Sequence, residues 1–245
     1  MIYPKPLLKP SGDRALRITF GDERSLRVNQ PVRALSRLIA SEALPGLLEM
    51  VPTYASMTVL YDPDAIDYDE LAGRLEDLAR QASAQETIEA SPRLLTIPVC
   101  YEGDYAPDMD YICDHTGLDQ NQVVGLHTAE AYFVFQLGFT PGCPFIGPLQ
   151  EQLHVPLMQS PRTRTPKGAV AISVGQTVIY PRATPGGMRI VGRTPVQLFQ
   201  LEHPDLTLFK PGDRVRFRAV SVQQYQAIEA RASALYDGVE SLSHG

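Results

Sequence analysis

Glycine and proline crowd one stretch of this sequence, and the crowding limits the folds open to the chain more than any other feature. Residues 138–212 hold 9 of the 18 glycines and 11 of the 21 prolines, spaced between short apolar runs such as AVAIS (169–173). Helix interiors tolerate neither residue well, whereas tight turns between short strands use both. The stretch therefore predicts a compact β-barrel. We extend this domain over residues 91–220, because LLTIPVCY (94–101) and PGDRVRFRAV (211–220) also indicate strands.

Residues 1–90 carry a different pattern. An early run of alternating polar and apolar residues predicts a strand, and Asn29 before Pro31 predicts the start of a helix. Two short apolar runs then predict a hairpin, and a second helix is expected to open at Asp67 or Asp69. This β-α-β-β-α order is that of a ferredoxin-like half, which one further strand would complete. We therefore predict an α+β protein that begins with a small ferredoxin-like domain.

The other segments are simpler to interpret. Helical patterns around 108–115 and 119–127 precede an apolar run at 131–139 that favours a strand. Residues 81–92 are polar and small, which is typical of a linker. Residues 221–245 predict a C-terminal helix followed by a loose tail.

Charge and composition exclude several classes of protein. The formal net charge is −6, whereas a general nucleic-acid binder needs positive charge or a concentrated basic face. No apolar stretch approaches the roughly 20 residues that span a bilayer, and the N-terminus has no apolar core of a signal peptide. The three cysteines, Cys100, Cys113 and Cys143, are an odd and sparse set typical of reduced thiols. We expect a cytoplasmic protein that binds neither nucleic acid nor membrane.

One long window lacks acidic residues altogether. The 50 residues between Glu151 and Glu202 contain no Asp or Glu. The window carries six basic residues: Arg162, Arg164, Lys167, Arg182, Arg189 and Arg193. Arginines without neighbouring carboxylates favour an anion site for a carboxylate, carbonate or phosphate ligand, and we assign Arg162, Arg164, Lys167 and Arg193 to it. The alternatives are a solvated basic face, or arginines that pair with acids of the N-terminal half or of another chain.

A histidine and a glycine loop suggest chemistry nearby. His127 ends a helical pattern and precedes the loop of Gly138, Pro141 and Gly142, whose backbone N–H groups could form an anion-binding nest. A histidine beside such a loop can act as a general acid or base, so His127 is the candidate catalytic residue. The alternative is a helix-terminal histidine that only caps carbonyl groups.

No metal site is predicted. Cys113, His115, His127 and Cys143 lack the paired spacing of zinc ligands, so buried thiols and surface histidines are the simpler interpretation. Cys143 follows the glycine loop but is flanked by Pro144 and Phe145, which favours a buried thiol over a nucleophile. The residues leave open whether a metal binds.

Four ordered motifs resemble a known family. They are HTAEAYFVFQLGFTPGCPFIGPL (127–149), SPRTRTPKGAVAI (160–172), GQTVIYPRATPGG (175–187) and GRTPVQLF (192–199). They are similar to the family of the B subunit of 5-oxoprolinase, also described as allophanate hydrolase subunit 1 or as carboxyltransferase subdomains C and D. The family includes the inhibitor of a sporulation histidine kinase. The resemblance implies a small α+β domain followed by a cyclophilin-like β-barrel.

The resemblance also implies an activity and partners. The chain is expected to act in an ATP-dependent 5-oxoprolinase, which converts 5-oxoproline to glutamate, and to be inactive alone. Its partners would be a carboxyltransferase A/B-type subunit, like the C subunit of 5-oxoprolinase, together with a protein like the A subunit of 5-oxoprolinase. ATP would be used by the assembled complex, and this chain would carry no biotin attachment. The alternatives are a carboxyltransferase subunit related to allophanate hydrolase and urea carboxylase, or a histidine-kinase inhibitor without enzymatic activity. The substrate would be a small anion or amide.

The residues that characterise the family motifs can be matched one by one to positions of this sequence. They fall on His127, Tyr132, Gly138, Phe139, Pro141, Gly142, Arg162, Pro166, Gly168, Gln176, Thr177, Tyr180, Pro181, Pro185, Gly186 and Gly187. Among them, Gln176 and Tyr180 join the predicted substrate-binding set. The chain departs from the family pattern at Cys143, Phe145, Ile146, Val174, Val178 and Met188. Smaller or β-branched side chains at a pocket wall would reshape the pocket, so these departures bear on the substrate more than on the fold. The cyclophilin-like architecture does not imply prolyl isomerase activity, because function belongs to sites and not to folds.

Overall fold

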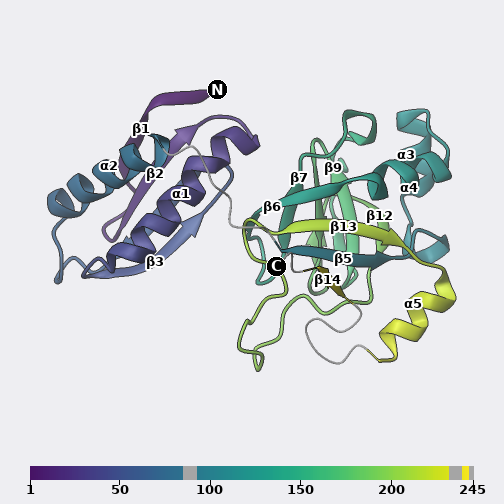
Figure 1. The fold of residues 1–245 in the computed structure, drawn as a ribbon. Coiled ribbons are helices and arrows are strands. Elements are labelled where there is room, and N and C mark those ends of the chain that lie inside the picture. Colours follow the sequence, from purple (N-terminus) through teal and green to yellow (C-terminus); the bar gives the residue numbers. More distant parts are fainter. Residues whose placement is uncertain (85–92, 232–238, 243–245) are drawn as a thin grey trace. The chain divides into compact units, whose positions relative to one another are not determined.

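The computed structural model describes residues 1–84, 93–231 and 239–242. It divides into two compact units, Met1–Ala90 and Ser91–Gly245 (Figure 1). Each unit has a hydrophobic core of its own. No helix among the described residues is long and apolar enough to cross a membrane.

The first unit is a four-stranded antiparallel sheet covered by two helices (Figure 1). Its elements are β1 (Ile2–Pro10), β2 (Ala15–Gly21), α1 (Leu26–Glu42), β3 (Leu47–Pro52), β4 (Ser56–Tyr61) and α2 (Tyr68–Ala84). The strands lie in the order β1-β2-β4-β3. The predicted β-α-β-β-α order corresponds to β2 through α2. The strand beside β2 is β1, which precedes this run in the chain, whereas a ferredoxin-like half would be completed by a strand after α2. The ferredoxin-like label stays a prediction.

The two predicted helix starts differ in outcome. Asp67 accepts a hydrogen bond from Glu70 N at 2.9 Å, which confirms it as one of the two expected starts of α2. The prediction of Asn29 as the cap of α1 is wrong, because Ser25 caps the helix and accepts from Val28 N at 3.3 Å. Asn29 is buried inside α1, where its amide donates to the carbonyl groups of residues 53 and 54. Asn29 therefore joins the helix to the β3–β4 turn.

The second unit is built on a curled eight-stranded sheet with the order β12-β9-β10-β7-β6-β13-β5-β14. These strands are β5 (Leu94–Val99), β6 (Ala131–Leu137), β7 (Pro144–Gly147), β9 (Ala169–Ser173), β10 (Gln176–Ile179), β12 (Arg189–Arg193), β13 (Arg214–Ala219) and β14 (Glu240–Leu242). Cys100, just after β5, exchanges two backbone hydrogen bonds of 2.8 and 2.9 Å with Arg193 at the end of β12. This bridge joins strands from opposite sides of the sheet, so the sheet curls around the core. The mixed α/β fold with a curled sheet is thus confirmed, while the cyclophilin-like label stays a prediction.

Shorter elements complete the second unit. They are η1 (Gly103–Tyr105), α3 (Met109–Thr116), α4 (Gln120–Ala129), η2 (Glu151–Leu153), β8 (Arg162–Thr165), β11 (Thr184–Gly186) and α5 (Val222–Glu229). Helices α3 and α4 and strand β6 lie where the sequence predicts them. The sequence predicts a loose tail, but β14 pairs antiparallel with β5 over residues 94–96. This pairing covers backbone groups that an edge strand would expose.

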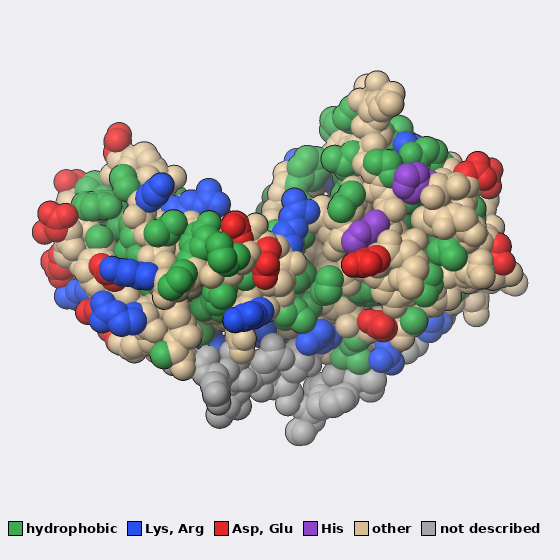
Figure 2. Space-filling model, turned by 90° about the horizontal axis from the view of Figure 1, so that it is seen from above, with side chains coloured by type: hydrophobic (Ala, Val, Ile, Leu, Met, Phe, Trp, Pro, Cys, Tyr) green, Lys and Arg blue, Asp and Glu red, His purple; other side chains and the backbone are tan. Residues whose placement is uncertain are grey.

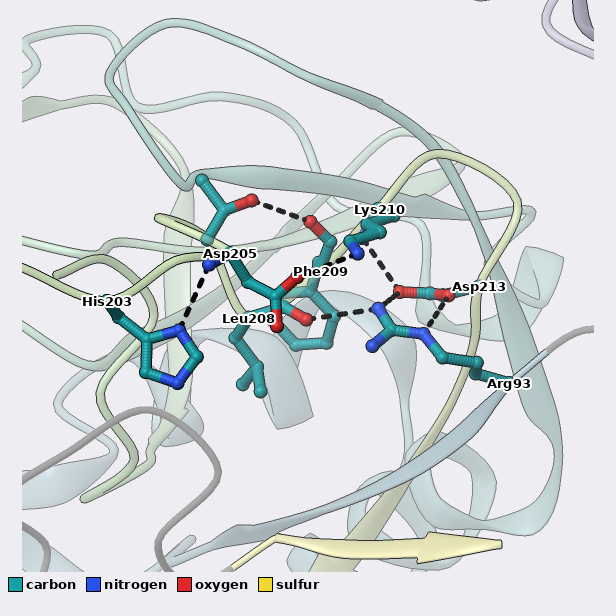
Figure 3. Close-up of polar contacts among 8 residues, drawn as sticks. Arg93, His203, Asp205, Leu208, Phe209, Lys210 and Asp213 are labelled. Atoms are coloured by element: carbon teal, nitrogen blue, oxygen red, sulfur yellow. Dashed lines mark hydrogen bonds and ion pairs between the residues drawn. The ribbon is translucent and has the colours of Figure 1, made fainter. Parts of the chain in front are cut away.

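An ion pair anchors the long connection between β12 and β13 (Figure 3). Arg93, just before β5, donates to both carboxylate oxygens of Asp213 at 3.0 and 2.6 Å. Its guanidinium also donates to the carbonyl of Leu208 at 3.2 Å, and Asp213 accepts from Lys210 N at 2.7 Å. A bidentate pair of this kind fixes geometry as well as charge. It holds the end of the connection against the start of β5.

Candidate functional site

Two cavities of the second unit share one loop, residues 138–143, between β6 and β7. The first, which we call the apolar cavity, has a volume of about 360 Å³ and is lined by Phe139, Cys143, Phe145, Pro161, Val178, Tyr180, Pro185, Gly186, Gly187 and Met188. The second, which we call the loop cavity, has a volume of about 420 Å³ and is lined by Leu137, Gly138, Phe139, Thr140, Pro141, Gly142 and Thr207. Phe139 lines both. Cavities of a few hundred Å³ are the usual size of small-molecule sites.

Neighbouring strands position the walls of the apolar cavity. Phe145 on β7 pairs with Val178 on β10, and Tyr180 follows β10 with its N–H bonded to the carbonyl of Ala169 at 2.9 Å. Pro185 and Gly186 of strand β11, which pairs with β8, line the same cavity. Cys143, Val178, Tyr180 and Met188 belong to one small hydrophobic cluster, against which Phe145 packs. The cavity is therefore held by rigid sheet elements and not by loops alone.

Phe139 combines exposure with an unusual backbone. Its φ is +64°, in the left-handed region, and its side chain is 67% exposed. A bulky residue rarely adopts this conformation, which costs about 1–3 kcal/mol. The ring lies edge-on to Tyr180, with 6.2 Å between ring centroids. The structure thus holds a large apolar side chain over the mouth of both cavities at a conformational cost.

The apolar cavity is electrically neutral. None of the ten residues that line it is charged at neutral pH. Burial raises the pKa of the Cys143 thiol to about 12 and also raises the pKa of the Tyr180 phenol. The thiol is therefore protonated at neutral pH, which fits the prediction of an inert Cys143. Such a cavity favours uncharged groups over ionised ones.

Two arginines of the acid-free window contact a carboxylate from outside the window. Arg162 donates to the Asp108 carboxylate at 2.5 Å, and the same carboxylate accepts from Ile190 N at 2.6 Å. The guanidinium of Arg189 stacks on the Tyr111 ring at 3.5 Å, with a nitrogen 3.9 Å from Asp108. For Arg162 and Arg189, the alternative of pairing with an acid from the N-terminal half is therefore the one observed. The guanidinium of Arg162 is bound to Asp108, so it would have to break this ion pair before it could bind an anionic ligand.

The other basic residues assigned to the predicted anion site line neither of the two cavities. Arg164 is exposed, Lys167 donates to the side-chain oxygen of Gln197 at 2.6 Å, and Arg193 donates to the carbonyl of Lys167 at 2.8 Å. Gln176 begins β10 and lines neither cavity. Of the predicted substrate-binding residues, Gly138, Gly142 and Tyr180 do line a cavity. Substrate binding by the remaining residues stays a prediction.

His127 lies in the core of the second unit, in the last turn of α4, and is fully buried. Its Nδ1 is 2.8 Å from the Tyr101 hydroxyl, its Nε2 is 3.3 Å from Thr177 Oγ1, and its ring stacks on Phe217 with 4.3 Å between centroids. Burial lowers its pKa from 6.5 to about 3. Figure 2 shows histidine side chains at the surface, and His127 is not among them. It lines neither cavity, and its catalytic role stays a prediction that this placement does not favour.

The sequence motifs did not identify the apolar side chains that line the apolar cavity as site residues. Cys143, Phe145, Val178 and Met188 stand out in the sequence only as departures from a family pattern, yet all four line the apolar cavity. The departures at Val174 and Ile146 lie elsewhere, because Val174 is exposed and Ile146 belongs to the main core. The signal in the sequence that could have located this cavity is therefore the set of positions that depart from the family pattern, four of which lie in its wall. No group of three or more His, Cys, Asp or Glu residues in the described part of the chain could hold a metal ion.

With this geometry in hand, comparison with known proteins gives the family. Residues 6–209 match the family described as carboxyltransferase domain, subdomain C and D. The chain therefore belongs to this family, as its motifs predicted.

Individual relatives are similar over most of the chain. It is 35% identical over 230 residues to the B subunit of 5-oxoprolinase from Bacillus subtilis (strain 168), covering 91% of this chain and 96% of that protein. It is 40% identical over 175 residues to the corresponding B subunit from Escherichia coli O157:H7, covering 71% and 78%. Urea amidolyase of Saccharomyces cerevisiae is 24% identical over 247 residues, which are 90% of this chain but 14% of that enzyme.

Solved structures agree on the fold. The structure of TTHA0988 is 33% identical, with a TM-score of 0.74, and the match covers 85% of this chain and 40% of that one. The urea carboxylase of Kluyveromyces lactis matches 99% of this chain with a TM-score of 0.81 at 21% identity. This chain spans 25% of the urea carboxylase chain. At that identity the likeness concerns the fold alone.

Proposed function

We propose that this chain is one component of an ATP-dependent 5-oxoprolinase, in which water adds across the ring amide of 5-oxoproline and yields glutamate. One observation carries the proposal: the Bacillus subtilis protein named as the B subunit of 5-oxoprolinase is similar to it over 91% of this chain and 96% of that protein. The apolar cavity, at about 360 Å³, is large enough for a small ring. We expect the chain to be inactive alone.

The relatives are named as one lettered subunit of 5-oxoprolinase, which indicates a multi-subunit enzyme. The partners we propose are a carboxyltransferase A/B-type subunit, like the C subunit of 5-oxoprolinase, together with a protein like its A subunit. Neither the apolar cavity nor the loop cavity is lined by a cationic side chain that could pair with a triphosphate. Arg162, which follows the lining residue Pro161 in the sequence, donates to Asp108. We therefore assign ATP binding to another component of the complex.

Reconstitution tests this proposal. The chain is co-expressed with the two partner types, and glutamate release from 5-oxoproline is followed with and without ATP. We expect release that requires ATP and stops when this chain is omitted, because the proposal makes the chain an obligatory component. Release from the partners alone at the same rate would exclude an obligatory role.

A carboxyltransferase role toward urea is the second candidate. It is favoured by the alignment with urea amidolyase over 90% of this chain. The same purified complex, supplied with carboxybiotin and urea, would then consume urea and leave 5-oxoproline intact. If the chain joined neither partner and instead slowed the autophosphorylation of a histidine kinase, the non-enzymatic alternative would replace both.

A further inference from the structure

Helix α1 carries its charges in an arrangement that does not stabilise a helix. The 18 residues between Glu23 and Glu42 contain four arginines and no acid. Arg27 lies in the first turn and Glu42 is the last residue, so each charge lies at the end of the helix dipole that has the same sign. Arg33 and Arg37 form a like-charge pair at i, i+4, which also costs stability. Helix stability therefore does not account for these arginines.

Helix α2 lies beside α1 on the same sheet, and its charges follow the stabilising rules (Figure 1). The first turn of α2 is acidic, and its arginines pair with acids of the same helix, as Arg74 does with Glu70 at 2.8 Å. In the part of the chain that the structure describes, Arg27 and Arg37 have no ion pair. Glu23, four residues before Arg27, instead accepts from the hydroxyl of the serine that caps α1. The two helices of one unit thus treat their charges differently.

The arginines lie on the outer face of α1. The inner face, with Val32 and Leu35, is buried in the core of the first unit. Arg27 and Arg37 are exposed, and Arg33 is half-buried. Ten residues of α-helix place Arg27 and Arg37 about 15 Å apart along the axis and about 80° apart around it. The outer face is therefore a basic strip that is too long for a single phosphate or carboxylate.

The partner of such a strip must be acidic over a similar length. A lipid bilayer is disfavoured, because the apolar face of α1 is already buried and cannot enter the acyl chains. A nucleic acid is disfavoured by the formal net charge of −6 on the whole chain. A protein segment with carboxylates spread over about 15 Å suits the arginines best, because each guanidinium can bind one carboxylate.

We propose that the outer face of α1, with Arg27, Arg33 and Arg37, is a docking surface for an acidic helix or strand of a partner protein. The partner supplies the carboxylates that Arg27 and Arg37 do not find in the described part of this chain. Charges placed against the rules of helix stability are then explained by binding. The surface rests on α1 alone, whereas the identity of the partner as the carboxyltransferase A/B-type subunit rests on the proposed function.

Charge reversal tests the docking surface. The double variant Arg27→Glu/Arg37→Glu is co-expressed with the carboxyltransferase A/B-type subunit, and the affinity of the purified chains is measured at about 0.05 M and about 0.5 M salt. We expect the unmodified complex to weaken with salt, and the double variant to bind about tenfold or more weakly at low salt. Its unfolding midpoint should be unchanged or higher, because an acid at position 27 suits the first turn and an acid at position 37 can pair with Arg33.

A matched control is Lys9→Glu/Arg17→Glu. Lys9 and Arg17 are exposed and lie opposite each other on β1 and β2 of the same unit. Neither has an ion pair to the residues that the structure describes. This variant reverses the same number of charges but should bind the partner normally. If both double variants lost affinity equally, binding would follow the net charge of the chain, and the proposal would be wrong.

A peptide probe keeps this proposal separate from the proposed function. A labelled helical peptide with glutamates spread over about 15 Å is titrated into the chain alone and followed by fluorescence anisotropy. We expect saturable binding that is about tenfold weaker for Arg27→Glu/Arg37→Glu and unchanged for the control. Tighter binding of a single-stranded oligonucleotide of equal charge would make the strip a nucleic-acid site and overturn the proposal.

The two proposals fail differently. If the double variant formed the complex with unchanged affinity and released glutamate normally, the docking surface would be overturned and the proposed function would stand. If the complex released no glutamate, while the double variant still bound the acidic peptide more weakly than the control, the proposed function would be overturned and the docking surface supported.

Discussion

Replacement of Asp108 by alanine is expected to lower the free energy of unfolding by about 3–5 kcal/mol, because it leaves two largely buried guanidinium groups without their carboxylate. The Asp108 side chain is 7% exposed and stands between Arg162 and Arg189. It also accepts from Ile190 N at 2.6 Å, and a buried N–H left without an acceptor adds to the cost. Urea denaturation of the two proteins, followed by circular dichroism, measures the difference.

Two further variants separate the causes. Asp110→Ala removes an exposed carboxylate from the first turn of α3 and should cost less than about 1 kcal/mol, the usual size of a helix-end charge interaction. Asp108→Asn keeps an acceptor for Ile190 N but removes the charge. Its loss in the free energy of unfolding should therefore lie between those of Asp108→Ala and Asp110→Ala. If Asp108→Ala and Asp110→Ala unfolded at the same urea concentration, the carboxylate would not be holding the arginines.

This ion pair shows where prediction from the sequence stops. The acid-free window is a true property of the sequence, and it favours arginines that face an anion. The carboxylate that neutralises Arg162 comes from 54 residues earlier in the chain. Local composition cannot report a partner so distant, because the pairing exists only once α3 packs beside β12.

The cavity illustrates the same limit at a finer level. The density of glycine and proline is enough to predict a barrel-like sheet with tight turns, and the predicted glycine loop at 138–142 does lie beside a cavity. The apolar lining could not be predicted, because Phe145, Val178 and Met188 come from three separate strands or turns. Only the register between strands brings them together. The pairing of Val178 with Phe145 is an example.

The helix starts show a local rule overridden by packing. Both Ser25 and Asn29 are residue types that cap helices. Ser25 caps the helix, which begins at Leu26, and the buried Asn29 amide instead donates to carbonyl groups of the β3–β4 turn. At Asp67 the capping bond itself is formed, and the same rule succeeds there.

His127 is a neutral part of the core, and its hydrogen bonds show which nitrogen carries the proton. Thr177 Oγ1 donates its one hydrogen to the carbonyl of Ala171 at 3.2 Å, so it can only accept from His127 Nε2–H. Nδ1 then accepts from the Tyr101 hydroxyl at 2.8 Å. A second proton on Nδ1 would require the Tyr101 hydroxyl to change from donor to acceptor and would place a charge in the core. The geometry and the lowered pKa of His127 therefore agree.

Because of His127, the stability of the protein should fall as the pH is lowered. Its pKa is about 3 in the folded protein and 6.5 when exposed, so below pH 6.5 the unfolded chain binds a proton that the folded chain refuses. The contribution is complete above pH 6.5 and lost progressively toward pH 3, about 2 kcal/mol by pH 5 and about 5 kcal/mol in total. Most carboxylates titrate below this range, so urea denaturation between pH 5 and 7 reports mainly on histidine.

His127→Phe should be less stable at pH 7 but should lose less stability between pH 7 and 5 than the unmodified protein. Thr177→Val keeps the histidine and should preserve the full pH dependence. Equal pH dependence in His127→Phe and the unmodified protein would contradict a buried neutral histidine and would return His127 to the candidates for proton transfer.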